Sequence, residues 1–139
     1  MNAVKDILLP AAMPAPAQLL RHPVRDGLKV VLQGGDGRFE TIRECWHALA
    51  DEVRARRPRT LLIVDRLAGG QLTAEQQQSL ITSLVGRGFE GVRMAYVVRP
   101  QTEFAFAESA ELHARVLGYE IRVFDTEAAA ERWLRHGEH

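Results

Sequence analysis

Apolar and polar residues alternate along residues 18–33, QLLRHPVRDGLKVVLQ, in two stretches that flank Asp26 and Gly27. A period of two is typical of strands with one buried face, and an Asp-Gly pair suits the positive φ angles of a tight turn. The pattern therefore predicts an opening β-hairpin. Pro23 lacks an N–H group, so the first strand is expected at an edge of the sheet.

The next stretch changes to a helical period. Apolar residues spaced three and four apart predict a helix over 38–56 with one buried face; they are Ile42, Cys45, Trp46, Leu49 and Val53. Because Trp46 lies at the centre of this face, Trp46→Ala is expected to destabilise the fold by about 3–5 kcal/mol. The continuous apolar run TLLIVD at 60–65 predicts a strand that is buried on both sides, as in a parallel sheet.

Helices and strands then alternate to the end of the chain. Thr73 and Gln76 have the spacing of a capping box, which predicts a helix over 74–85. Further elements are expected as a strand over 92–98, a helix over 102–117, a strand over 119–124 and a final helix capped by Asp125 or Thr126. The order β-β-α-β-α-β-α-β-α predicts an α/β fold: an opening hairpin followed by right-handed βα units in a mainly parallel sheet.

Length and composition narrow the possibilities. The 139 residues suit one domain, expected at 18–136 after a Pro/Ala-rich extension over 1–17. Eighteen basic and eighteen acidic residues cancel, which argues against a nucleic-acid partner. No apolar run approaches the roughly 20 residues of a membrane span. The lone Cys45 excludes an internal disulfide, so a cytoplasmic location is expected.

The sequence contains no motif that requires catalysis. It has no phosphate-binding P-loop, and GGDG at 34–37 has the wrong spacing for a dinucleotide fingerprint. The five histidines show no i, i+4 pair of the kind that binds zinc on a helix. Cys45, placed on an apolar face, is interpreted as a small hydrophobe. We therefore expect no enzyme activity, no cofactor and no metal.

Polar residues do gather where the predicted strands end, and parallel βα units bring those ends to one edge. The candidate binding residues at this edge are Asp65, Arg66, Thr73, Arg99, Gln101, Thr102, Asp125 and Thr126. Nearby helix N-termini would favour a small anion. The alternative is ordinary helix capping and ion pairing, with Asp65 bonded to the Gly-rich turn that follows it.

Two segments give the chain a family resemblance. LLIVDRLAGGQLT, ending at Thr73, has a strand, an acidic residue, a loop and a capped helix, and GYEIRVFDTEAAAERWL at 118–134 has a strand, Phe-Asp and a helix ending in Trp-Leu. Together they resemble STAS-like domains of the SpoIIAA-like family, which share the fold of bacterial anti-sigma-factor antagonists and are sometimes grouped with Sec14-like lipid-binding domains.

The resemblance implies a non-enzymatic regulatory module that binds a protein partner or a small anionic ligand. The family's Asp-Ser-Ser-Gly phosphorylation hallmark is absent, because Ala68, Gly69 and Gly70 occupy that loop, and Thr73 is expected to be a structural cap. The alternative is a small-molecule or lipid-binding domain, or a small enzyme of another type, although so short a chain leaves little room for a lipid cavity. A homodimer through a free sheet edge is also expected.

Overall fold

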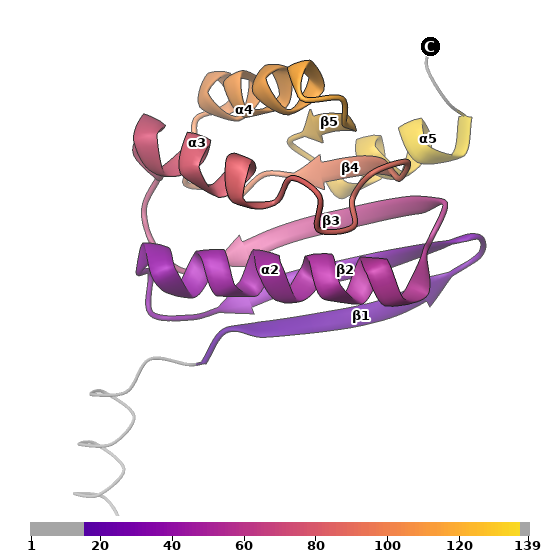
Figure 1. Ribbon diagram of the computed structural model, residues 1–139, viewed down its shortest axis with the longest axis horizontal. Helices are drawn as coiled ribbons and strands as arrows, with labels where there is room; N and C mark the ends of the chain where they lie inside the picture. Colours follow the sequence, from indigo (N-terminus) through magenta and orange to yellow (C-terminus); the bar gives the residue numbers. More distant parts are fainter. Residues whose placement is uncertain (1–15, 137–139) are drawn as a thin grey trace, which may run out of the picture.

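The computed structural model describes residues 16–136, and a single sheet lies at the centre of the fold (Figure 1). Its strands, in both chain and spatial order, are β1 (Gln18–Val24), β2 (Gly27–Gly34), β3 (Thr60–Leu67), β4 (Arg93–Val97) and β5 (Glu120–Phe124). β1 pairs with β2 antiparallel, and every later pair is parallel. The predicted α/β class, with an opening hairpin and a mainly parallel sheet, is confirmed. Of the expected N-terminal extension, residues 1–15 lie outside the described residues.

Helices connect the parallel strands as the hydrophobic periodicity predicts. The helices are α2 (Phe39–Arg56), α3 (Ala74–Ser83), α4 (Phe104–Val116) and α5 (Glu127–His136). The capping box at the start of α3 is present in full: the Thr73 hydroxyl accepts from the Gln76 N–H, and the Gln76 side chain accepts from the Thr73 N–H. Thr126 caps α5 by accepting from the Ala129 N–H at 3.2 Å, which decides between the two expected caps.

The hairpin turn lies one residue earlier than predicted. Val24 pairs with Gly27, so the turn consists of Arg25 and Asp26, and only Asp26 has a positive φ of 60°. Gly27 is needed for a different reason: a Cβ there would lie 2.9 Å from the carbonyl oxygen of Thr60 on the neighbouring strand. The glycine therefore allows close approach of two backbones rather than an unusual turn conformation.

Two predicted boundaries also shift. Strand β3 continues through Asp65 and Arg66 to Leu67 because β2 pairs with it up to that point. Arg66 and Leu67 are therefore within the sheet and not in the loop that was expected to follow Asp65. Helix α4 begins at Phe104, so Gln101 and Thr102 belong to the turn after β4.

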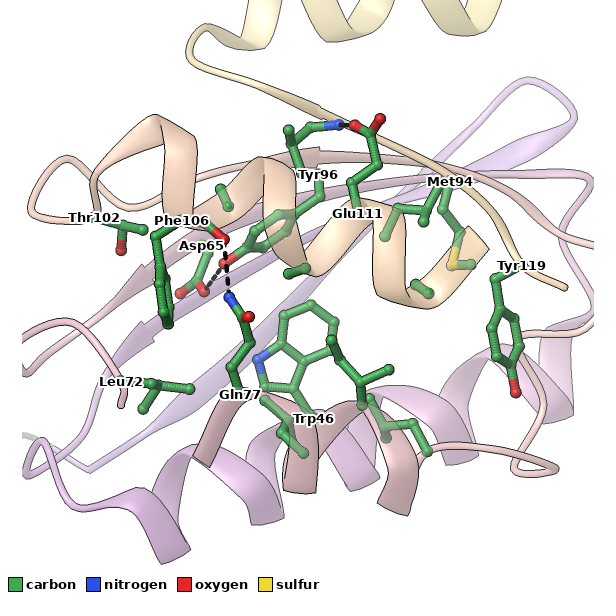
Figure 2. Close-up of a pocket in the computed structure, with 18 of the residues that line it drawn as sticks. Trp46, Asp65, Leu72, Gln77, Met94, Tyr96, Thr102, Phe106, Glu111 and Tyr119 are labelled. Carbon is green, nitrogen blue, oxygen red and sulfur yellow. Dashed lines mark hydrogen bonds between the residues drawn. The ribbon is translucent and has the colours of Figure 1, made fainter. Parts of the chain in front are cut away.

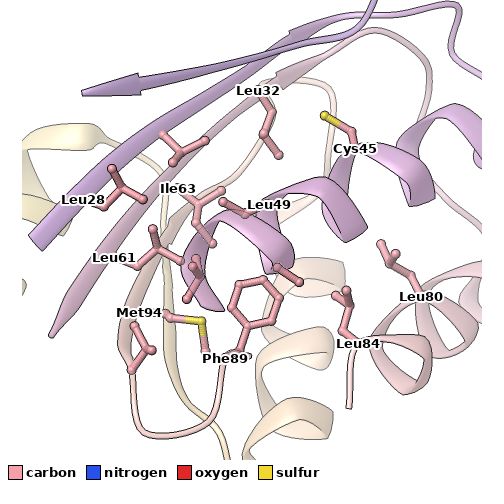
Figure 3. Packing of buried hydrophobic residues seen from close by; sticks show 14 of the residues in the cluster. Leu28, Leu32, Cys45, Leu49, Leu61, Ile63, Leu80, Leu84, Phe89 and Met94 are labelled. Atoms are coloured by element: carbon pink, nitrogen blue, oxygen red, sulfur yellow. The ribbon is translucent and has the colours of Figure 1, made fainter. Parts of the chain in front are cut away.

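The sheet has a core on each face. On the first face, apolar residues of β2, β3 and β4 pack against α2 and α3; they include Leu28, Leu32, Leu49, Leu61, Ile63 and Leu80 (Figure 3). On the opposite face, Val31, Val64 and Val97 pack against Ala130 and Trp133 of α5. Helix α4 adds Ala107 to the first face, against Val123. The two faces differ in how completely they are filled, and that difference creates the site described next.

Candidate functional site

A pocket of about 140 Å³ lies on the first face of the sheet, under α2, α3 and α4 (Figure 2). Its surface is almost entirely apolar, and it is partly open to solvent. Three alanines of α4, Ala107, Ala110 and Ala114, line it at helical spacing. Because an alanine side chain is a single methyl group, this face of α4 cannot fill the space between itself and α3. The small side chains of α4 therefore leave the space that forms the pocket.

Aromatic side chains from several elements surround the pocket. Trp46 rises from α2 towards Tyr96 of β4, with ring centroids 5.5 Å apart and the planes tilted by 58°. Phe106 of α4, Phe89 and Tyr119 also line it. Trp46 is half-buried rather than fully buried. The sequence expectation of a central core tryptophan is therefore wrong in this respect, because the indole borders a pocket instead of filling the core.

One end of the pocket is polar and centres on Asp65 and Tyr96. The Tyr96 hydroxyl donates to Asp65 Oδ2 at 2.6 Å, and the Leu67 N–H donates to Oδ1 at 3.1 Å. Asp65 is 4% exposed, and burial raises the pKa of its carboxyl despite these hydrogen bonds and nearby Arg99. Burial, the Asp65 charge and the shared hydrogen bond raise the pKa of Tyr96 well above its ordinary value. The phenol therefore keeps its proton and remains a donor to Asp65.

Arg99 adds a buried positive charge at the same end. Its Nε lies 4.0 Å from Asp65 Oδ2, while its terminal nitrogens donate to the loop after β3. The carbonyl acceptors, at 2.9–3.4 Å, are those of Leu67, Ala68, Gly69 and Gly70. Gln101 donates to two of the same oxygens. These bonds fix the loop and engage both terminal nitrogens of Arg99.

The fixed loop also has a steric requirement. Gly69 has a φ of +115°, and a Cβ there would lie 2.8 Å from the Cα of Gly37. Two backbone segments therefore touch where the loop meets the turn after β2. This close approach explains glycines in both Gly-rich segments without any role in binding a cofactor phosphate.

Gln77 bridges the two helices that border the pocket. Its side chain is buried, and its Nε2 donates to the Phe106 carbonyl of α4 at 3.0 Å (Figure 2). Glu111, which also lines the pocket, accepts from the Val123 N–H at 2.8 Å, and its other oxygen lies 3.6 Å from Arg115. The Glu111 carboxylate is thus held by β5 and its own helix. Asp65 is left as the carboxylate nearest to Tyr96.

The residues predicted from strand ends do not form one continuous edge. Asp65, Arg99 and Thr102 line the pocket, and Gln101 lies beside them on the loop carbonyls. Arg66 lies 3.9 Å from Glu127 of α5 and is exposed. Thr73 and Thr126 are helix caps, and Asp125 is exposed beside the second of them. Half of the predicted set therefore gathers at the pocket, and the other four residues lie outside it.

Most pocket residues were not predicted as site residues, and Trp46, Gln77 and Tyr96 are the most informative of them. Trp46 was assigned to the core, and Gln77 belongs to the polar run EQQQ, where a single buried glutamine cannot be recognised. Tyr96 offered a weak signal, because it is an aromatic residue with a polar tip in the apolar strand MAYVV. Its hydroxyl needs a buried partner, and Asp65 on the adjacent strand provides one.

Cys45 and the arginines in the last turn of α2 have plain structural explanations. Cys45 is a buried free thiol, and burial together with the charge of Asp65 raises its pKa to about 11. Arg54 and Arg56 pair with acidic residues on their own helix, Asp51 and Glu52. Within residues 16–136, no three His, Cys, Asp or Glu side chains converge in a way that could hold a metal ion. Over the same range, no helix has the length and apolar character needed to cross a membrane.

Comparison with known proteins gives no family assignment. No protein-family model matches the chain, and no curated protein matches it. The pocket geometry is therefore the basis for a functional proposal.

Proposed function

We propose that this chain is a non-enzymatic binding module whose ligand is a small, mostly apolar molecule held in the pocket under α2, α3 and α4. The observation that carries the proposal is the pocket itself: apolar walls ending in a hydrogen-bonded polar pair, Asp65 and Tyr96. Binding sites are concave, mostly apolar and supplied with a few convergent polar groups, and this pocket has those properties.

The volume limits the size of the ligand. An apolar cavity of about 150 Å³ holds one benzene molecule, whereas pockets for drug-sized ligands occupy about 300–1,000 Å³. At about 140 Å³, the pocket suits a single six-membered ring or a short branched chain. A long lipid tail does not fit this volume. The small-molecule alternative is thereby favoured over the lipid alternative.

Two polar side chains near the pocket, Cys45 and Arg99, are poorly suited to catalysis. A nucleophile or general base needs a pKa near the working pH and a free path to its substrate. Cys45 is held neutral by a pKa of about 11, and the donors of Arg99 are engaged by loop carbonyls. The same engagement weakens the expectation of an anion site at the strand ends, because Arg99 and Gln101 already donate to loop carbonyls.

A regulatory role of the STAS-like kind is the finer proposal. It rests on the resemblance of 118–134 and of the segment ending at Thr73, and it implies that ligand binding changes contact with a protein partner. The helices α3 and α4 would carry that change, since they border the pocket and are joined by Gln77. A cytoplasmic location fits such a role and remains an expectation.

Tryptophan fluorescence tests the proposal directly. Trp133 lies on the other face of the sheet, so Trp133→Phe leaves Trp46 as the reporter at the pocket. We expect toluene to change the Trp46 emission and raise the melting temperature in a saturable manner, and dodecanoate to do neither. If toluene produced no saturable change in either measurement, the binding proposal would be wrong.

A matched pair of variants locates the binding. Ala110→Leu adds three carbon atoms to a residue that lines the pocket, and Ala105→Leu makes the same change at an exposed position of the same helix. We expect Ala110→Leu to abolish the toluene response and Ala105→Leu to preserve it. Equal loss in both variants would place binding elsewhere.

A further inference from the structure

If the proposed function is correct, the charges at the polar end of the pocket indicate which chemical class of ligand it binds. We propose that the pocket selects a small neutral molecule with a hydroxyl group, such as a phenol, and that this hydroxyl donates a hydrogen bond to the Asp65–Tyr96 pair. Three features of the pocket favour such a ligand: the balance of charge, the free acceptors and the shape of the walls.

The charges at the polar end cancel. Asp65 and Arg99 are both buried, at 4% exposed each, and their nearest atoms are 4.0 Å apart. A cationic ligand would lie beside the Arg99 guanidinium, and an anionic ligand would lie beside the Asp65 carboxylate. In either case a charge would leave water for an apolar pocket and meet a like charge. A neutral ligand avoids both penalties.

The polar end offers acceptors for hydrogen bonds. The Tyr96 hydroxyl donates a hydrogen bond to Asp65, and its oxygen keeps lone pairs that can accept another. The Asp65 carboxylate has about four acceptor positions, and the Tyr96 hydroxyl and the Leu67 N–H occupy two of them. The terminal nitrogens of Arg99 donate to the loop carbonyls. A ligand that donates a proton therefore complements this end better than one that only accepts.

The walls favour a flat ring. Trp46 and Tyr96 meet at 5.5 Å, and Phe106 lines the pocket on the same side as Asp65 (Figure 2). Aromatic pairs prefer offset or edge-to-face contacts, which these tilted rings can offer to a third ring. A hydroxyl compound with one aromatic ring satisfies this preference, fits the size limit and can donate to the free acceptors.

The test compares phenol with fluorobenzene, which has nearly the same shape but no proton to donate. In a purely apolar pocket, fluorobenzene would bind more tightly, because phenol loses more hydration. We expect the wild-type protein to bind phenol more tightly, with dissociation constants measured by isothermal titration calorimetry. Tighter binding of fluorobenzene would overturn the inference while leaving the proposed function intact, and absence of binding by both would overturn the two together.

Two matched tyrosine variants assign the selectivity. Tyr96→Phe keeps the ring and removes the hydroxyl, and we expect the phenol-to-fluorobenzene preference to fall by about tenfold, the effect of one hydrogen bond. Tyr119→Phe removes a hydroxyl that donates to Glu90 and does not contact the Asp65–Tyr96 pair, so its preference should match the wild type. An unchanged preference in Tyr96→Phe would contradict the assignment. So would benzoate or benzylammonium binding more tightly than phenol to the wild type.

Discussion

Each face of the sheet carries one tryptophan, and the two indoles have different surroundings. Trp133 of α5 is 7% exposed, lies 5.7 Å from the Phe124 ring and is covered by the Arg93 guanidinium 3.8 Å from its centroid. Trp46 of α2 is half-buried, contacts Tyr96 and borders the pocket. The same residue type thus fills a core on one face and walls a cavity on the other.

The difference follows from the neighbours that each face provides. The α5 face combines Val31, Leu62 and Val64 with Ala130, and these apolar side chains pack closely around Trp133. The opposite face includes Asp65 and Gln77, whose polar tips must reach hydrogen-bond partners and so cannot pack freely. Polar side chains that bridge strands or helices hold those elements in place. Beside them, the alanines of α4 leave space.

The largest predicted effect compares the two tryptophans. Trp133→Ala removes a packed indole and should lower the free energy of unfolding by about 3–5 kcal/mol. Trp46→Ala should cost less than about 3 kcal/mol, because part of its ring already borders a pocket. Urea denaturation of both variants measures this. Equal losses would mean that the two faces are packed alike.

Enlarging an alanine to leucine should destabilise the α5 face more than the pocket face. Ala130 is fully buried, so Ala130→Leu should overpack the α5 face and destabilise the protein by about 1–3 kcal/mol. Ala110→Leu has the pocket to enter and should be neutral or stabilising. Melting temperatures of the two variants provide the comparison. A large loss in Ala110→Leu would show that the pocket cannot accept three carbon atoms.

The buried carboxylate of the pocket face should give stability a pH dependence. Because the pKa of Asp65 is raised by burial, the folded state holds this proton more tightly than the unfolded state. Its contribution to stability is complete below the ordinary pKa near 4 and is lost as pH rises through the raised value, with a slope of at most about 1.4 kcal/mol per pH unit. Asp65→Asn should lack this loss. Parallel stability curves for the two proteins, measured from pH 3 upwards, would contradict the prediction.

The smallest predicted effect concerns the helix that borders the pocket. Thr73→Ala removes one half of the α3 capping box and should cost about 1 kcal/mol, whereas Thr73→Asp should be tolerated because Asp also caps well. Thermal unfolding measures both. If Thr73→Asp kept full stability but abolished binding to a partner that Thr73→Ala retained, Thr73 would be a phosphorylation switch and not a structural cap.

The sequence by itself determined the order of elements, the hairpin, the cap at Thr73 and the class of sheet. These features depend on local chemistry: period-two and period-3.6 patterns, turn residues and capping side chains act within a few positions. The sequence also placed Asp65 and Arg99 at the ends of neighbouring strands. That placement brought them to the same end of the site.

Tertiary structure alone decided what these residues do. Asp65 accepts from Tyr96, which is 31 positions away in the sequence, and Arg99 donates to the carbonyl of Gly70, which is 29 positions away. Which residues become partners depends on strand register and helix placement, and neither is encoded in a local pattern. The pocket is decided in the same way, because a void arises only from the volumes of side chains on α2, α3, α4 and the sheet taken together.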